Sequence, residues 1–171
     1  MPIQRLNHAV LYVRDVERSV AFYAEALGFR PVTGMRMSKQ AAFLQAAGSS
    51  NDHDLGLFGI GADAGPSGAG RTTVGLYHLA WEVDTLSELA RIADKLSDLG
   101  ALVGASDHGT TKSLYGHDPD GIEFEIAWLI PAHLITEDAL TQRGVQPLDI
   151  AAEQARYGAE TKGGIGVSVS A

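Results

Sequence analysis

Two histidines and two glutamates have the side-chain types and positions needed to hold a metal ion. His8 and His78 each lie near the start of an apolar, β-rich run, and Glu123 and Glu125 share one face of a later run because side chains alternate along a strand. Two imidazoles with one carboxylate form the facial triad of non-haem Fe(II) oxygenases, which leaves positions open for a bidentate substrate and a small gas molecule. The alternative also stays open: the histidines can be core or surface residues, and both glutamates can face solvent.

The secondary-structure elements that must position these residues form an internal repeat with two copies. In each copy a β-rich run is followed by a helical stripe and then by three short strand candidates. His8 and His78 occupy equivalent places in the two copies, 78 − 8 = 70 residues apart. If two such modules pack with approximate twofold symmetry, equivalent residues can converge near the axis.

Local signals mark the ends of both expected helices. Asp15 is a plausible N-cap of the first, and Thr85 with Glu88 forms a capping box for the second. Gly28 and Gly100 suit the position just after each helix. The strand candidates lie near Leu6–Val13, Phe29–Met35, Gln40–Ala46 and Asp54–Ile60 in the first copy, and near Leu76–Val83, Ala101–Ser106, Thr111–His117 and Ile122–Leu129 in the second.

This pattern predicts an α+β fold of two packed βαβββ modules, since a single module would leave one sheet face bare. We expect one domain over residues 1–130, with modules at about 4–60 and 74–130 and a Gly-rich linker at 61–73. Residues 131–171 form a C-terminal tail, with short helices near Ile135–Arg143 and Asp149–Tyr157 and a fraying end at Thr161–Ala171. The sequence does not decide whether this tail packs on a sheet, caps a cleft or contacts another subunit.

Composition excludes several classes of protein. With 171 residues, 45% of them hydrophobic and 20% charged, the chain can build a core and is not intrinsically disordered. The net charge of −8 disfavours nucleic acid or an anionic membrane as the main partner. The chain has no cysteine, so a disulfide framework and a thiolate metal site are excluded. With no apolar run long enough to span a bilayer, we expect a cytoplasmic protein.

The doubled pattern with its histidines resembles the vicinal oxygen chelate superfamily, which contains glyoxalases, bleomycin resistance proteins and dioxygenases. Residues 108–125, HGTTKSLYGHDPDGIEFE, resemble the signature of its type I extradiol (catechol 2,3-) dioxygenases. One departure precedes this stretch, where Ser106 stands in place of the usual Gly, Asn, Thr, Ile or Val. The positions that match are His108, Leu114, Tyr115, Asp118, Pro119, Gly121 and Glu125.

The resemblance implies a role for each residue that it covers. It implies His8, His78 and Glu125 as metal ligands, with Fe(II) the expected metal and Mn, Zn or Ni the alternatives. It implies His108 and Tyr115 as residues that bind the substrate oxygens and assist proton removal. A second local match, Asp52-His53-Asp54-Leu55, implies His53 as the acid–base histidine. Lys112 lies inside the signature and could contact an anionic substrate, although a solvated lysine is the simpler interpretation.

Three hypotheses for function follow. The first is an Fe(II)-dependent extradiol dioxygenase that cleaves a catechol-type ring with O2, in the catabolism of aromatic compounds, as a possible homodimer. The second is an isomerase, lyase or thiol transferase of the same superfamily that uses Zn, Ni or Mn. Glyoxalase I-type sites in that branch add a fourth ligand from the last strand of the first module, and Leu55–Ile60 offers none. The third is a metal-free protein that binds or sequesters a small molecule.

Overall fold

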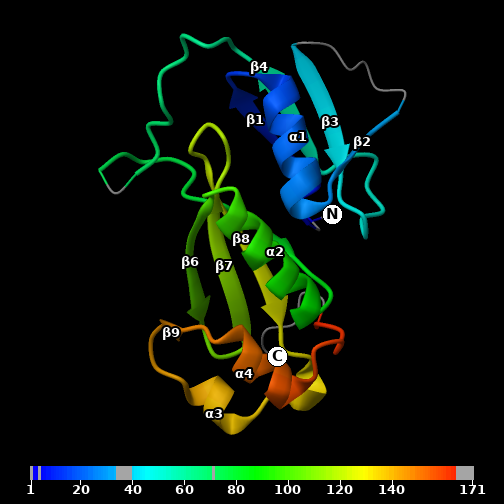
Figure 1. Cartoon of the computed structure of the whole chain (residues 1–171), viewed down its shortest axis with the longest axis vertical. Helices are drawn as coiled ribbons and strands as arrows, with labels where there is room; N and C mark the ends of the chain where they lie inside the picture. Colours follow the sequence, from blue (N-terminus) through cyan, green and yellow to red (C-terminus); the bar gives the residue numbers. More distant parts are fainter. Residues whose placement is uncertain (1, 4, 34–39, 71, 165–171) are drawn as a thin grey trace. The chain divides into compact units, whose positions relative to one another are not determined.

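The chain has an α+β fold with two sheets, as the doubled sequence pattern predicts (Figure 1). The computed structural model describes residues 2–3, 5–33, 40–70 and 72–164. It divides the chain into two compact units, residues 1–67 with 118–121, and residues 68–117 with 122–171. Within the described ranges, no helix has the length and apolar character that a membrane span requires. The predicted domain boundaries stay a prediction.

In the first unit, one helix covers one face of a four-stranded sheet. The strand order is β1-β4-β3-β2, in which β1 runs parallel to β4 and the remaining pairs are antiparallel. Along β1, Leu11 and Val13 are buried while Val10 and Tyr12 are exposed, so the sheet has one core face and one open face. The elements are β1 (Ala9–Val13), α1 (Val16–Leu27), β2 (Arg30–Pro31), β3 (Ala41–Gln45) and β4 (Leu55–Gly59).

The second unit repeats this arrangement and extends it. Its sheet has the order β5-β8-β7-β6-β9, with β5 parallel to β8 and antiparallel pairing elsewhere. The side chains of α2 that are buried in the core are Leu86, Leu89, Ile92 and Leu96. The elements are β5 (Leu79–Glu82), α2 (Leu86–Asp98), β6 (Leu102–Asp107), β7 (Thr111–His117), β8 (Glu123–Leu129), η1 (Ala132–Leu134), α3 (Glu137–Thr141), β9 (Gln146–Pro147) and α4 (Ile150–Tyr157).

The helix signals read from the sequence are confirmed. The Asp15 side chain accepts a hydrogen bond from the Arg18 N–H at 3.0 Å, and the Thr85 hydroxyl accepts one from the Glu88 N–H at 3.1 Å. Gly28 ends α1 with φ of 72°, a left-handed conformation that favours glycine. Because capping depends on residues a few positions apart, both helices could be placed from sequence alone.

Strand ends differ from the predictions where partners are missing. β1 begins at Ala9 instead of Leu6, since its parallel partner β4 begins opposite Ala9 at Leu55. The strand predicted at Phe29–Met35 is reduced to Arg30–Pro31, with one further hydrogen bond from the Val32 N–H to the Phe43 carbonyl at 2.9 Å. Residues 34 and 35 of that prediction, and residues 165–171 of the fraying end, lie outside the described residues.

The C-terminal segment packs on the second unit. Its short strand β9 pairs with the edge of β6, and α4 lies beside α2 (Figure 1). Trp128 donates its ring N–H to the Thr161 carbonyl at 3.2 Å, and its ring lies 5.7 Å from that of Tyr157. The tail therefore completes the core of this unit and covers one of its sheet edges, an alternative that the sequence left open.

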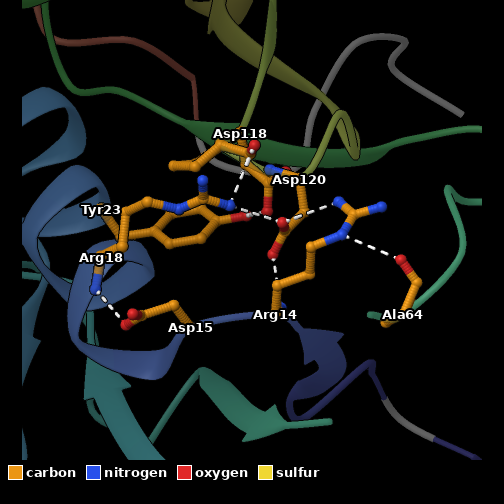
Figure 2. A network of polar contacts seen from close by, with 8 residues as sticks. Arg14, Asp15, Arg18, Tyr23, Ala64, Asp118 and Asp120 are labelled. Atoms are coloured by element: carbon orange, nitrogen blue, oxygen red, sulfur yellow. Dashed lines mark hydrogen bonds and ion pairs between the residues drawn. The ribbon is translucent and has the colours of Figure 1, made fainter. Parts of the chain in front are cut away.

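The turn that joins β7 to β8 is held by the first unit. Asp120 accepts hydrogen bonds from the Arg14 backbone N–H (2.8 Å) and from the guanidinium groups of Arg14 (3.0 Å) and Arg18 (2.6 Å) (Figure 2). Tyr23 donates its hydroxyl to the buried Asp118 carboxylate at 3.2 Å. These contacts fix the turn from which β8 departs, and β8 carries Glu125.

The buried hydrogen bond between Tyr23 and Asp118 predicts that the protein becomes less stable at alkaline pH. Burial and the Asp118 carboxylate raise the pKa of Tyr23 well above its ordinary value near 10. The folded state therefore keeps the phenol proton that the unfolded state releases, so stability falls as pH rises above about 10, by about 1.4 kcal/mol per pH unit for one proton.

Urea unfolding between pH 9 and 11 should show this slope, and Tyr23→Phe should remove that contribution. The control Tyr12→Phe, which changes a phenol that is 70% exposed, should retain the slope. An identical slope in Tyr23→Phe would contradict the assignment.

Candidate metal centre

The open face of the second sheet gathers polar side chains from three strands. Ser113, Tyr115 and His117 alternate along β7, and the register places Tyr115 opposite Glu125 and His117 opposite Glu123 on β8. β5 pairs Leu79 with Phe124, so the preceding residue, His78, comes beside Glu123 and Glu125. The other face of β8 buries Phe124, Ile126 and Trp128.

His78 and Glu125 converge on one point. The Nε2 atom of His78 lies 3.1 Å from Oε2 of Glu125, and the two side chains are 25% and 14% exposed. Two donor atoms each about 2.1 Å from a common ion, and at right angles to each other, are about 3.0 Å apart. The pair therefore has the spacing of two neighbouring ligands of an octahedral ion as well as that of a direct hydrogen bond.

Ser113 holds the second oxygen of Glu125. Its hydroxyl donates to Oε1 at 2.5 Å, and Ser113 is fully buried. Because one carboxylate oxygen is occupied in this way, the other is left to face His78. Partners of this kind, which bind a ligand residue instead of the metal, fix its orientation and tune its affinity.

His108 and Tyr115 lie on the same side of this sheet and contact each other. His108 Nε2 and the Tyr115 hydroxyl are 2.8 Å apart, and the Tyr115 ring lies 5.9 Å from that of His78. Burial and then the nearby Glu125 carboxylate raise the pKa of Tyr115 above its ordinary value near 10. The phenol is consequently a hydrogen-bond donor at neutral pH, backed by an imidazole that can take its proton.

The first unit holds a pair of histidines of its own, His8 and His53. The Nδ1 atom of His8 lies 2.8 Å from Oδ1 of Asn7, and since an amide oxygen only accepts, Nδ1–H is the donor; in the neutral ring the lone pair is then on Nε2. The His53 ring lies 4.5 Å from that of His8 and meets Phe43 edge to face at 5.1 Å. His8 thus has the tautomer that a metal ligand bound through Nε2 requires.

The structure brings the predicted residues together in two groups. His78, Glu125, His108 and Tyr115 gather in the second unit, while His8 and His53 gather in the first. Over the described ranges, no three His, Asp or Glu side chains are grouped so as to hold a metal ion. The donor chemistry of His78 and Glu125, with their 3.1 Å separation, fits two of the three ligands of a divalent ion.

Lys112 does not belong to this group. It is 1% exposed, and its ammonium binds Asp107 Oδ1 at 2.6 Å and Glu153 Oε2 of α4 at 3.2 Å. It points away from the open face, because it alternates with Ser113 along β7 and lies opposite Trp128. The prediction that Lys112 contacts the substrate and the alternative that it is solvated are both wrong, because its ammonium is buried in an ion pair with the tail.

Sequence reasoning missed three supporting residues. Ser113 could have been found from the period of two that it shares with Tyr115 on β7. Asn7 adjoins His8 in the chain, and an amide beside a ligand histidine is a weak signal by itself. The sequence predicts the face of Glu123 but gives no role to His117, whose Nε2 lies 3.4 Å from Oε2 of Glu123.

Comparison with known proteins identifies the family of this chain. The family model described as "Glyoxalase/Bleomycin resistance protein/Dioxygenase superfamily" matches residues 5–126. The chain belongs to this superfamily. A curated member, catechol-2,3-dioxygenase of Bacillus subtilis (strain 168), is 30% identical over 124 residues, which cover 71% of this chain and 40% of that protein.

Other members extend the comparison. Biphenyl-2,3-diol 1,2-dioxygenase 3 of Rhodococcus globerulus is 33% identical over 128 residues, covering 71% of this chain and 62% of that protein. The present chain therefore spans less than two thirds of the length of either dioxygenase. A domain from Frankia sp. EAN1pec, titled glyoxylase/bleomycin resistance protein/dioxygenase, has a TM-score of 0.64 at 22% identity over 78% of this chain and 98% of its own. Lactoylglutathione lyase from Agrobacterium tumefaciens has a TM-score of 0.54 at 22% identity over 74% and 95%. These two likenesses show the fold alone.

The Ser113 contact generates a prediction about metal affinity. Ser113→Ala frees the second oxygen of Glu125, so the affinity for Mn(II) should fall about tenfold. Competition with a fluorescent chelator measures this directly. Ser106→Ala is a matched control, because Ser106 lies opposite Ser113 on the neighbouring strand β6. Equal affinities of Ser113→Ala and the unaltered protein would show that the hydroxyl does not position the carboxylate.

Proposed function

We propose that this protein is an Fe(II)-dependent extradiol dioxygenase that cleaves the ring of a catechol-type substrate. His8, His78 and Glu125 would hold the metal, and both atoms of O2 would enter the product beside the diol. One observation supports this most strongly: the 3.1 Å pair of His78 and Glu125 shares its sheet face with the hydrogen-bonded pair of Tyr115 and His108. A metal-binding pair beside a proton-transfer pair matches the needs of a substrate with two acidic hydroxyls.

His8 supplies the third ligand in this proposal. Its support is the repeat position that it shares with His78, together with the Asn7 contact that leaves Nε2 free to bind. The alternative ions Mn, Zn and Ni suit the same donors, because two imidazoles and one carboxylate accept several divalent metals. Sequence resemblance to the ring-cleaving members favours iron.

The residues of the chain divide the proton chemistry between them. When bound, the metal ion lowers the pKa of the substrate hydroxyls and compensates the charge of the resulting anion. Tyr115 would accept the proton that a substrate hydroxyl releases and would pass its own hydroxyl proton to His108, whose Nε2 lies 2.8 Å from the Tyr115 oxygen. His53, whose ring meets that of Phe43 edge to face, would serve as a proton donor during the reaction with O2. The product is a ring-opened semialdehyde.

A metal-dependent lyase, isomerase or thiol transferase is the second candidate. The same fold carries lactoylglutathione lyase in another organism, so the fold does not separate these activities. The residues of β4 argue for the dioxygenase, since Leu55–Gly59 presents no side chain able to act as a fourth ligand. The third candidate, a metal-free binding protein, requires the Glu125–His78 pair to serve no metal.

The proposal is tested by reconstituting the protein with Fe(II) under anaerobic conditions and supplying a panel of catechols with O2. We expect oxygen uptake together with a new yellow ring-fission chromophore. Tyr115→Phe should retain bound iron and lose at least about 100-fold in turnover, because a positioned proton-transfer group contributes about 10²–10⁴-fold. His8→Ala should lose the iron.

Each other outcome assigns the protein differently. Iron bound in a 1:1 ratio without oxygen uptake would overturn ring cleavage of these substrates and favour the lyase or isomerase chemistry. Absence of bound metal would overturn the ligand assignment and leave the binding protein. Unchanged turnover in Tyr115→Phe, with oxygen uptake intact, would remove Tyr115 from the proton-transfer pair.

A further inference from the structure

We propose that Glu123 is a positioning residue for His78, and that its carboxylate accepts the Nδ1–H of this ligand when Nε2 binds the metal. This inference rests on the proposed metal site. It adds a residue that neither the signature motif nor the expected ligand set includes. Glu123 does not touch the reacting atoms in this arrangement and acts only through the imidazole.

His78 presents a buried ring nitrogen that needs a partner. Its Nδ1 atom is inaccessible to solvent and makes no hydrogen bond with any residue that the structure describes. Imidazole ligands of metals nearly always donate this second N–H to a carboxylate, a carbonyl or water, which fixes the ring orientation and its tautomer. A buried N–H left without an acceptor destabilises the folded state, because it loses the hydrogen bond that it makes with water in the unfolded chain. The environment of His78 therefore calls for an acceptor close to Nδ1.

Glu123 is placed to be that acceptor. Its Oε1 atom lies 4.0 Å from His78 Nδ1, about 1 Å beyond hydrogen-bond distance. The backbone supports this placement independently, since β5 runs parallel to β8 with Leu79 opposite Phe124, and the residues preceding that pair are His78 and Glu123. Oε1 needs to approach Nδ1 by about 1 Å for a hydrogen bond to form.

The other oxygen of Glu123 is held by His117. Oε2 lies 3.4 Å from Nε2 of His117, which pairs directly with Glu123 across the β7–β8 ladder. The Glu123 side chain is 19% exposed, so its orientation is restricted by these neighbours. Glu123 thus plays for His78 the part that Ser113 plays for Glu125 and Asn7 plays for His8.

The experiment compares metal affinity and the histidine proton in three variants. Zn(II) alone is the probe, with affinity measured by competition with a chromogenic chelator and the Nδ1–H of His78 observed by NMR in the ¹⁵N-labelled, zinc-loaded protein. Glu123→Ala removes the acceptor, and Glu123→Gln keeps an oxygen that can accept. Glu82→Ala is the matched control, because Glu82 is an exposed carboxylate that faces the same side from β5. Thermal unfolding of each variant reports whether it is folded.

We expect Glu123→Ala to weaken zinc binding 10- to 100-fold and to expose the His78 Nδ1 proton to solvent exchange. Glu123→Gln should restore most of the affinity and the protected proton, and Glu82→Ala should match the unaltered protein. Equal zinc affinity and an equally protected proton in Glu123→Ala would overturn the role of Glu123 while leaving the metal site intact. Failure of the unaltered protein to bind zinc would overturn the metal site and this inference together. If Glu123→Ala does not fold, the result for Glu123→Gln decides: an exchanging His78 proton in it overturns the inference.

Discussion

The polar face of the second sheet must hold two carboxylates, of Glu123 and Glu125, beside the single imidazole of His78. Glu123 and Glu125 are 19% and 14% exposed and approach opposite nitrogens of His78. Like charges this close, with limited access to water, repel each other and are costly to desolvate. Positive charge at their centre, from an imidazolium or a divalent ion, offsets both costs. Donors at the outer oxygens, from Ser113 and His117, stabilise the arrangement further.

The rest of this unit supports that face from behind. β8 alternates between the polar open face and a buried face on which Phe124, Ile126 and Trp128 pack. The tail reinforces the buried side, where Lys112 is neutralised by Asp107 and by Glu153 of α4. Glu153 belongs to the tail. Without the tail, the buried ammonium of Lys112 would therefore lose one of its two partners, so the tail is part of the core.

Much of this could be predicted from the sequence, because the signals are local. Helix caps at Asp15 and Thr85 depend on residues three positions away, and β7 has the predicted bounds Thr111–His117. Strand ends were less predictable, since they depend on where a distant partner begins. The burial of Lys112 could not be predicted, because its partner Glu153 lies 153 − 112 = 41 residues further along the chain. Hydrogen-bond partners of site residues were missed for a similar reason: strand alternation gives the face, and only the register gives the neighbour.

The proposed function requires His8 and the His78–Glu125 pair to bind the same metal ion. X-ray absorption spectroscopy of the Fe(II)-loaded protein tests it most directly, because multiple scattering from imidazole rings counts the histidine ligands. We expect two imidazoles and light O/N donors in the unaltered protein, and a single imidazole, if any iron is retained, in His8→Ala. Two imidazoles in iron-loaded His8→Ala, or one in the unaltered protein, would contradict it.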